Sequence, residues 1–431
     1  MRPLAGRKLW FVGLGGSGMS ALAIVAKAWG AAVGGSDRSR TPYFPLLARH
    51  GIDVVLGHAA ENVPEGWEVV FSTAIPPENP ELRTRGPLLR RGELLAELCA
   101  LRPSIVVAGA HGKTTTAGMI AFALDRLGLD PAFLIGGEIP QLGGNARAGD
   151  GWLVAEGDES DRSLALLSPR IAVVTNVELD HHATFASQAE VEELFESWLV
   201  SLSPGAIVIR GEEVELPDRL ELALLGEHNR RNAACALAAL EAAGADTAAA
   251  QEALSEFGGV RRRLEARGES AGVRVYDDYA HHPSEIAATL DAACSIAAGG
   301  RLIVLFQPHL YTRTLHLALE LAGALRAADL VCVTEVYGSR ESPLDGVSGK
   351  LVVERLCELE PGMAVGWMPL LEDSVELVAS EARAGDLVLT MGAGDVDLAV
   401  PLILERLEGT RAPGREAPGR RSEDGGARSS R

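Results

Sequence analysis

Two glycine-rich loops, each set between an apolar segment and a helical pattern, constrain the fold of this chain more than any other feature. The first loop, Gly13-Leu-Gly-Gly-Ser-Gly18, follows the apolar segment 8–12 and precedes a helical pattern over 19–29. The second, Gly109-Ala-His-Gly-Lys-Thr-Thr-Thr116, follows the apolar segment 105–108. A strand, a glycine loop and a helix in this order are typical of parallel α/β sheets that bind phosphate groups at helix N-termini.

The same alternation continues along the chain and predicts three α/β domains in series. The 431 residues suit about three domains of about 150 residues each. We expect an N-terminal Rossmann-like domain over 1–102, a central P-loop-type ATPase α/β domain over 103–258, and a C-terminal Rossmann-like α/β domain over 259–408, followed by a disordered tail over 409–431. Further strands are expected at 171–175, 273–276, 302–306, 330–333 and 387–390. Alanine-rich helices are expected at 232–245 and 317–328.

Charge and composition exclude several classes of function. The formal net charge of −19 disfavours binding to nucleic acid or to an anionic membrane, because like charges repel at long range. No apolar run reaches about 18 residues and no signal peptide is present, so we expect a cytoplasmic protein. The five cysteines form no CxxC pair, which predicts buried, unpaired thiols.

The first loop predicts a site for a pyrophosphate. The backbone N–H groups around Gly15, Gly16 and Gly18 can approach phosphate oxygens at the start of the helix. Asp37 lies 19 residues beyond Gly18, where an acidic side chain can bind a ribose hydroxyl. On this loop alone, a dinucleotide-dependent oxidoreductase remains an open alternative.

The second loop is the more specific signal. Gly112, Lys113 and Thr114 are arranged as in a P-loop, where the lysine contacts the β- and γ-phosphates and the threonine hydroxyl binds magnesium. The strict motif fails, because Val107 occupies the position of its first glycine. The chain has only four lysines, and Lys113 is the only one between residues 27 and 350, which makes a chance lysine at this point improbable.

Carboxylates follow the second loop at the ends of apolar segments. Glu156 ends one such segment, and Asp180 and His181 follow another. Carboxylate oxygens suit Mg²⁺, whereas His181 is explained equally well as a structural residue and as a ligand. Together, the two loops indicate a protein that joins a nucleotide-linked substrate to ATP-driven chemistry.

These residues belong to a longer series of motifs that resembles the Mur ligases. The series runs in order from about residue 8 to residue 400. It comprises Gly13-x-Gly-Gly-x-Gly-Met-Ser20, Gly109-x-His-Gly-Lys-Thr-Thr-Thr116, Glu156-x-Asp-Glu-Ser-Asp161, Thr175-Asn-x-x-x-Asp-His181, Gly226-x-His-Asn-x-x-Asn232, Gly259-Val-Arg-Arg-Arg-Leu-Glu265, Asp277-Asp-Tyr-Ala-His-His-Pro283, Gln307-Pro-His-Leu-Tyr-Thr-Arg313 and Gly392-Ala-Gly-Asp395.

The resemblance implies a reaction and a set of ligands. It implies ATP-dependent ligation of L-alanine to UDP-N-acetylmuramic acid through an acyl phosphate, with ATP and Mg²⁺, in cytoplasmic peptidoglycan synthesis and thus in cell-wall biogenesis, cell shape and division. No nucleic-acid or membrane partner is implied, and the oligomeric state is left open. The UDP group would occupy the first loop, because a glycine loop binds a pyrophosphate whatever lies beyond it.

The resemblance also implies roles for particular residues. The catalytic set is Lys113, Glu156, His181 and Arg313. The magnesium ligands are Thr114, Glu156 and His181. The ATP site comprises Gly109, His111, Gly112, Lys113, Thr114, Thr115, His228, Asn229, Asn232, Arg262 and Asp278, and the substrate site comprises Gly15, Gly16, Gly18, Asp37, His58, His281 and Arg313. Asn229 is interpreted equally well as the N-cap of a helix. Arg262, Arg263 and Arg313 can bind the alanine carboxylate or phosphate, because a guanidinium fork suits both.

Two departures from the family pattern and one absence qualify the resemblance. Leu310 stands where the family often has arginine, and Ala110 where it often has threonine. No lysine is available after Asp180-His181 for the carbamylated lysine of several related ligases, which favours the alanine-adding branch. The alternatives are a ligase that recycles a whole tripeptide onto the same sugar, a nucleotide-binding oxidoreductase, and a regulator without catalytic activity.

Overall fold

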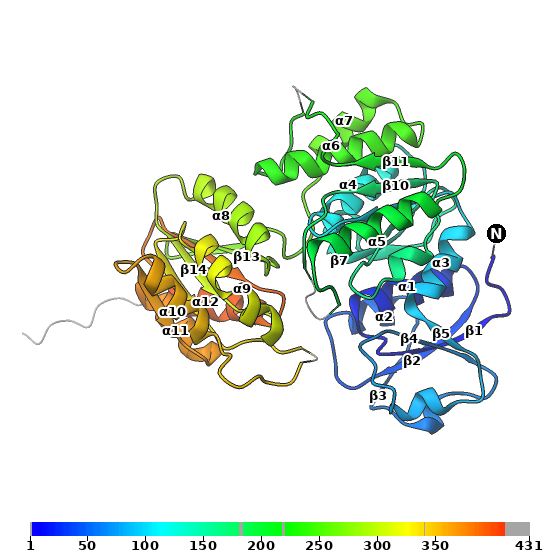
Figure 1. Ribbon diagram of the computed structural model, residues 1–431, viewed down its shortest axis with the longest axis horizontal. Helices are drawn as coiled ribbons and strands as arrows, with labels where there is room; N and C mark the ends of the chain where they lie inside the picture. The colour runs from blue at the N-terminus through cyan, green and yellow to red at the C-terminus, as the bar shows by residue number, and fades with distance from the viewer. Residues whose placement is uncertain (1, 181–183, 218–219, 340, 410–431) are drawn as a thin grey trace, which may run out of the picture.

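The computed structural model describes residues 2–180, 184–217, 220–339 and 341–409. It contains three sheets, each built from consecutive strands and covered by helices, so the chain is a mixed α/β protein (Figure 1). The predicted His181 and the predicted tail over 410–431 lie outside the described residues. The predicted boundaries at 103 and 259 fall between sheets, since the central strands span 104–210 and the last sheet begins at 265.

The first sheet is parallel, with the strand order β3-β2-β1-β4-β5. The strand β1 lies between β2 and β4, so the first glycine loop leaves the sheet at the point where the strand order reverses, which is where ligands bind in such sheets. Its elements are β1 (Lys8–Val12), α1 (Ser17–Ala28), β2 (Ala32–Asp37), α2 (Phe44–Arg49), β3 (Val54–Leu56), β4 (Glu68–Phe71), β5 (Leu88–Arg90) and α3 (Arg91–Ala100).

The second sheet has the order β11-β10-β6-β9-β7-β8, and only β8 runs antiparallel to its neighbour. The strand β6 is buried along its whole length, because α4 covers it on one side and the first domain's core reaches the other. Its elements are β6 (Ser104–Ala108), α4 (Lys113–Arg126), β7 (Ala132–Ile139), β8 (Gly144–Arg147), β9 (Leu153–Glu156), β10 (Ile171–Val174), α5 (Gln188–Ser201), β11 (Ile207–Arg210), α6 (Glu227–Ala242) and α7 (Thr247–Ser255).

The third sheet has the order β12-β13-β17-β14-β15-β16, with β12 antiparallel to β13 and the other pairs parallel. Its strands β14 and β17 are fully buried between helices on both faces. Its elements are β12 (Glu265–Ser270), β13 (Val273–Asp278), α8 (Pro283–Ala297), β14 (Leu302–Phe306), α9 (Tyr311–Leu325), β15 (Leu330–Val333), α10 (Lys350–Leu359), β16 (Ala364–Trp367), α11 (Leu371–Glu381), β17 (Leu387–Met391) and α12 (Ala399–Gly409).

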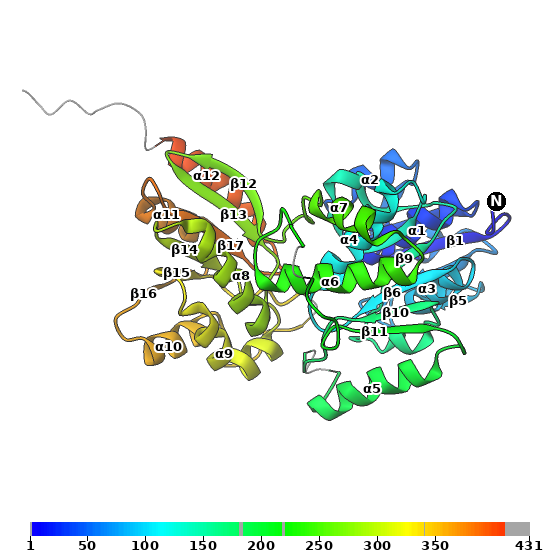
Figure 2. The same cartoon turned by 90° about the horizontal axis from the view of Figure 1, so that it is seen from above.

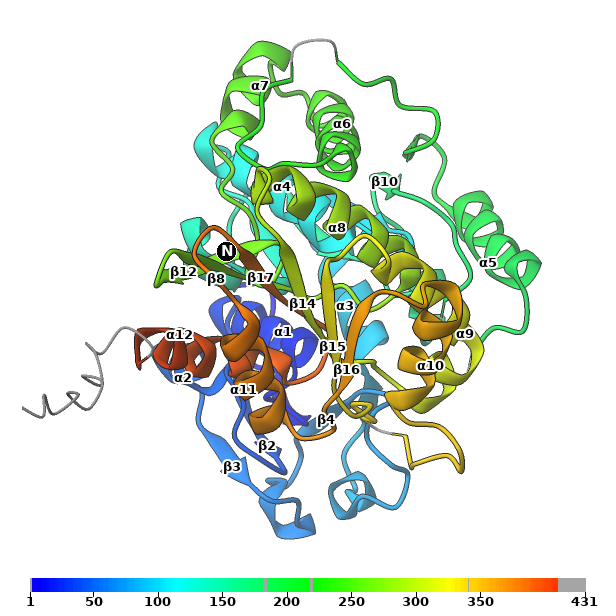
Figure 3. The same cartoon turned by 90° about the vertical axis from the view of Figure 1, so that its left-hand side faces the viewer.

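The three sheets form two visibly separate bodies. The first and second domains pack together on the right of Figure 1, and their cores merge into one cluster of buried residues. The third domain lies on the left and faces the second across α6 and α8, as Figure 2 also shows. The helices α6 and α8 contact each other at this junction, and in the view of Figure 3 the C-terminal domain with α8 lies in front of the central domain. This junction positions the candidate site.

Several sequence predictions need correction at the ends of helices. The helix α6 begins at Glu227 instead of 232, and α9 begins at Tyr311 instead of 317, because polar first turns hide the apolar periodicity. The helix α12 runs to Gly409, so the tail cannot begin there.

The prediction of buried thiols is wrong for Cys294 and Cys357, which are exposed, although all five cysteines are free of disulfide bonds.

Candidate functional site

A cavity of about 460 Å³ lies at the junction of the central and C-terminal domains. Its walls come from the P-loop, from the segments after β10 and β11, from the start of α6, and from β13 and α8. It brings together most of the predicted ATP residues. The lining includes His111, Gly112, Thr115, Asn176, Glu178, His228, Asn229, Asn232, Arg263, Asp278 and Glu285.

The P-loop is held in place by the ends of the neighbouring strands. The amide of His111 donates a hydrogen bond to Asn176 Oδ1 at 2.9 Å, and its carbonyl accepts one from Thr175 Oγ1 at 2.6 Å. Gly112 precedes α4 with a φ of +80°, and a Cβ there would lie 2.3 Å from Asn232 Oδ1. This close approach explains why glycine is required immediately before Lys113.

Lys113 is paired with a carboxylate. Its ammonium donates to both oxygens of Glu159, at 2.8 and 3.1 Å, and Glu159 is only 3% exposed. Burial opposes the charge on Lys113, but the attraction of Glu159 outweighs it and raises the pKa of the lysine. Burial also raises the pKa of Glu159 to about 7. Glu159 therefore occupies the position relative to Lys113 that an anionic phosphate would take.

The oxygen atoms beside Lys113 fit a magnesium ion. Thr114 Oγ1 donates to Glu156 Oε2 at 3.1 Å, so a hydroxyl and a carboxylate converge at the start of α4. Burial raises the pKa of Glu156, which indicates a charge that lacks solvation. These are the hard oxygen donors that Mg²⁺ prefers.

The first turn of α6 faces the P-loop. Asn232 approaches Gly112, while burial lowers the pKa of His228. Asn229 is not the N-cap, because Gly226 holds that position. Instead, Asn229 Nδ2 donates to Leu225 O at 2.7 Å, so the N-cap interpretation is wrong.

The arginines of the C-terminal domain divide into two kinds. Arg262 donates to Asp277 Oδ2 at 3.1 Å and to the carbonyls of Gly392 and Gly394, at 2.7 and 3.0 Å. These bonds join two strand ends and engage all of its nitrogens. Arg263 instead lines the cavity beside Glu285.

The segment before α8 contributes two predicted residues. Asp278 accepts hydrogen bonds from the amides of Leu264 and Ala280, both at 2.6 Å, while burial raises its pKa to about 6. Burial lowers the pKa of His281 to about 4, and its Nδ1 lies 2.9 Å from the carbonyl of Tyr279. His281 is thus neutral at neutral pH, with Nε2 available as an acceptor if Nδ1 carries the hydrogen.

The first glycine loop closes on its own acidic residue. Asp37 Oδ2 accepts the amide hydrogen of Gly15 at 2.9 Å. His58 Nδ1 lies 3.0 Å from Ser36 Oγ and 3.4 Å from Glu81, whose carboxylate is fully buried. The structure therefore places Asp37 at the loop, and His58 in a hydrogen-bond network beside it.

Two family models match the chain on either side of the P-loop. The model described as "Mur ligase family, catalytic domain" matches residues 8–102, and that described as "Mur ligase, glutamate ligase domain" matches residues 262–394. A UDP-N-acetylmuramate–L-alanine ligase of Rubrobacter xylanophilus is 41% identical over 93% of this chain and 100% of its own length. The chain belongs to the Mur ligase family.

Other Mur ligases are similar over nearly the whole chain. The UDP-N-acetylmuramate–L-alanine ligase of Saccharopolyspora erythraea is 41% identical over 93% of each chain. Among solved structures, the UDP-N-acetylmuramate–alanine ligase of Thermotoga maritima superimposes with a TM-score of 0.80 at 28% identity, covering 94% of this chain and 100% of that one. A murein peptide ligase of Psychrobacter arcticus gives a TM-score of 0.70 at 25% identity, over 95% and 100%.

Membership of the Mur ligase family identifies the chain as an ATP-dependent ligase and confirms the predicted three-domain α/β architecture. It excludes the oxidoreductase and the non-catalytic regulator. None of the helices in the described ranges is long and apolar enough to cross a lipid bilayer.

Sequence reasoning missed two contributors to this Mur ligase site. The motif that contains Glu156 does not by itself assign a role to Glu159, although its position three residues after Glu156 brings both to the P-loop. Arg91, the first residue of α3, donates to Asp158 at 2.7 Å and to Asp161 at 3.0 Å. It therefore fixes the acidic segment against the first domain, a contact that sequence spacing does not reveal.

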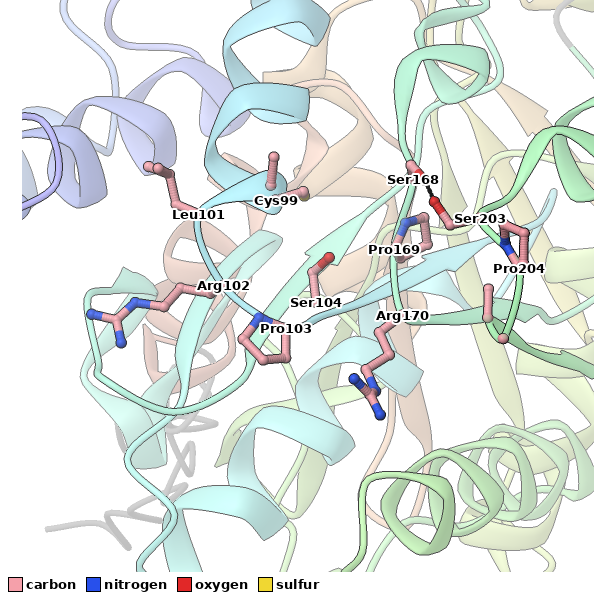
Figure 4. Close-up of a pocket in the computed structure, with 13 residues that line it drawn as sticks. Cys99, Leu101, Arg102, Pro103, Ser104, Ser168, Pro169, Arg170, Ser203 and Pro204 are labelled. Atoms are coloured by element: carbon pink, nitrogen blue, oxygen red, sulfur yellow. Dashed lines mark hydrogen bonds between the residues drawn. The ribbon is translucent and has the colours of Figure 1, made fainter.

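A second cavity, of about 560 Å³, lies away from this site (Figure 4). Its lining residues precede β6, β10 and β11, whereas the P-loop follows β6, so the two cavities lie at opposite edges of the central sheet. Ser168 and Ser203 form a hydrogen bond across it at 3.2 Å. It contains none of the predicted site residues.

Proposed function

We propose that this chain ligates L-alanine to UDP-N-acetylmuramic acid in the cytoplasm, using ATP and Mg²⁺, as a step of peptidoglycan precursor synthesis. The observation that carries the proposal is the convergence of Lys113, Thr114 and Glu156 with C-terminal residues at one domain junction. The names of the relatives supply the substrates, and the T. maritima alanine ligase supports this branch over the peptide ligase.

The charges of the reactants define what the site must do. A carboxylate attacks the γ-phosphate of ATP to form an acyl phosphate, and the amine of alanine then displaces phosphate. Both reactants of the first step are anionic, so positive charge has to be placed between them. Thr114 and Glu156 would hold Mg²⁺, which supplies part of that charge when bound.

The side chains of the chain itself would supply the rest. Lys113 exchanges Glu159 for the phosphates of ATP, and Arg263, which faces the same cavity, neutralises phosphate charge. We therefore assign to Arg263 the ATP contact predicted for Arg262, whose donors are engaged within the protein. Neutral His281 can accept a hydrogen bond from the ammonium group of alanine.

The N-terminal loop would bind the other nucleotide. The amides around Gly15, Gly16 and Gly18 face the start of α1, where a pyrophosphate is favoured by the helix dipole. Because Asp37 holds Gly15, we propose that Asp37 shapes this loop as well as contacting UDP.

Phosphate release tests the proposal. The enzyme is incubated with ATP and UDP-N-acetylmuramate, with L-alanine added or omitted, and we expect release only when alanine is present. Lys113→Ala and Glu156→Ala should abolish it. Arg355→Ala, at an exposed position on α10 away from the cavity, serves as a control for altered charge. Activity with the tripeptide but not with alanine would indicate the recycling ligase instead.

A further inference from the structure

Three side chains at the domain junction converge in a way that the ligase reaction does not use. One ring nitrogen of His111, one of His282 and one oxygen of Glu178 lie within 4.8 Å of one another. His111 belongs to the P-loop and Glu178 follows β10, whereas His282 is the N-cap residue of α8. The cluster therefore joins the central domain to the C-terminal domain.

Two nitrogens of this cluster lack hydrogen bonds. His111 Nε2 and His282 Nδ1 are both buried without an aligned hydrogen bond in the described part of the chain. His111 Nε2 does face the carboxylate of Glu178, and although burial opposes its charge, Glu178 and Glu285 raise the pKa of His111 to about 9. His282 is only 6% exposed, and the two rings lie 4.7 Å apart between centroids. A buried nitrogen without a partner, as at His282 Nδ1, costs about 1–3 kcal/mol, so a compensating ligand is expected at that atom. At His111 a bound cation would displace the proton that the two carboxylates stabilise.

The spacing suits a small cation. His111 Nε2 lies 3.3 Å from Glu178 Oε2 without the alignment of a hydrogen bond. A tetrahedral ion with bonds of about 2.0 Å separates its ligand atoms by about 3.3 Å. His111 Nε2 and Glu178 Oε2 are therefore as far apart as two ligand atoms of a tetrahedral ion would be.

The groups behind these side chains are those of a metal site. His111 Nδ1 faces Glu285 Oε1 at 3.4 Å, which leaves Nε2 pointing toward Glu178. Ser284 Oγ donates to Glu178 Oε2 at 2.6 Å and orients that carboxylate. A metal-binding histidine commonly donates its second nitrogen to a carboxylate, and a ligating carboxylate is itself hydrogen-bonded.

We propose that His111, Glu178 and His282 bind a borderline divalent cation such as Zn²⁺ or Co²⁺, separate from the Mg²⁺ expected at Thr114 and Glu156. Two imidazoles and one carboxylate favour such ions over Mg²⁺, which prefers oxygen ligands. Three protein ligands leave a fourth position for water. The inference does not depend on the proposed substrates.

The position of this cation has a mechanical consequence. Two of its ligands are on the central domain and one is on the C-terminal domain, so binding fixes the two domains to each other. His111 and Glu178 also line the cavity assigned to ATP. Bound Zn²⁺ therefore holds the junction closed and slows any step that requires the domains to separate.

Cobalt binding to the full-length, nucleotide-free enzyme tests the site directly. Co²⁺ is titrated in the presence of excess Mg²⁺, and we expect one ion per chain, with the intense visible absorption of four-coordinate cobalt. Zn²⁺ should displace it and abolish the absorption. His282→Gln and Glu178→Gln should weaken binding by about tenfold or more.

Two control variants separate this site from other binding. His50→Gln changes an exposed histidine remote from the junction and should leave the titration unchanged. Thr114→Val removes a proposed magnesium ligand and should also leave it unchanged. Circular dichroism establishes that each variant is folded. Absence of the four-coordinate absorption in the wild-type protein, or equal Co²⁺ affinity in His282→Gln, would overturn the proposal.

Discussion

Arg313 of α9 and Asp180, which follows β10, form a buried ion pair between the C-terminal and central domains. Arg313 Nη2 lies 2.7 and 3.0 Å from the two Asp180 oxygens, and Nε lies 3.1 Å from Oδ1. Both side chains are less than 10% exposed. If Arg313 binds the carboxylate of alanine as predicted, that carboxylate must displace Asp180 from the guanidinium or bind beside it.

Asp180→Asn should destabilise the protein strongly. It leaves the Arg313 charge buried without a counter-ion, and breaking a buried pair in this way costs about 3–5 kcal/mol. Urea unfolding followed by tryptophan fluorescence measures the change. Glu376→Gln breaks the exposed pair with Arg406 and should have no measurable effect. Equal midpoints for Asp180→Asn and the wild type would show that the pair does not stabilise the fold.

Glu159→Gln should tighten the binding of ADP and ATP. The substitution preserves the shape of the side chain but removes the negative charge that competes with phosphate for Lys113. We expect the dissociation constant to fall by about tenfold, which corresponds to about 1.4 kcal/mol. Calorimetric titration measures it. Glu190→Gln, on an exposed ion pair, is the matched control. Weaker nucleotide binding in Glu159→Gln would mean that the carboxylate assists phosphate binding.

Glu159 should also give the stability a distinctive pH dependence. Its pKa of about 7 lies above the 4.5 of an unperturbed glutamate, so the folded state binds the proton more tightly than the unfolded state. The stabilisation from this proton is present below pH 4.5 and is lost as the pH rises to about 7. Melting curves from pH 5 to 8 should show a smaller decline for Glu159→Gln than for the wild type. Parallel declines would contradict the assignment.

Gly112→Ala should inactivate the enzyme, whereas Gly128→Ala should be tolerated. Both glycines have a positive φ, of +80° and +71°, so both substitutions carry a backbone cost of about 1 kcal/mol. Only at Gly112 would the new Cβ collide, at 2.3 Å from Asn232 Oδ1, while at Gly128 no atom lies within 4 Å. Phosphate-release rates and melting temperatures of the two variants isolate the collision. Retained activity in Gly112→Ala would show that the P-loop can shift.

Thr114→Val should raise the Mg²⁺ concentration needed for half-maximal activity. The substitution keeps the size of the side chain but removes the hydroxyl that meets Glu156. Thr114→Ser retains the hydroxyl and should behave like the wild type. Magnesium titrations of the phosphate-release rate compare the three proteins. An unchanged requirement in Thr114→Val would remove this residue from the proposed magnesium site.

The sequence predicted the parts of this molecule that are local. The loops around Gly15 and Gly112 each lie between adjacent elements, so their strand-loop-helix order indicated both the sheets and the P-loop. The sequence predicts too late a start for α6, because the first turn of that helix is polar. A turn of this composition gives no apolar periodicity. In the structure, the helix begins after Gly226, whose φ is +97°.

Contacts between distant segments could not be predicted in the same way. The partner of Arg91 lies 67 residues away, and that of Arg313 lies 133 residues away in a different domain. Charge and motif identified Arg313 as a functional candidate, but nothing in its neighbourhood indicated Asp180. The pairing depends on how two separately formed sheets meet, and local patterns carry no information about that arrangement.

The isolation of Lys113 makes the P-loop accessible to spectroscopy. The chain has four lysines; Lys8 and Lys350 are exposed and Lys27 is partly so, while the Lys113 side chain is 19% exposed and held by Glu159. Reductive ¹³C-methylation would therefore give a spectrum with very few amine signals, of which only that of Lys113 should shift when nucleotide displaces Glu159. In this protein of 45.4 kDa, the signal of one lysine would therefore report whether nucleotide is bound.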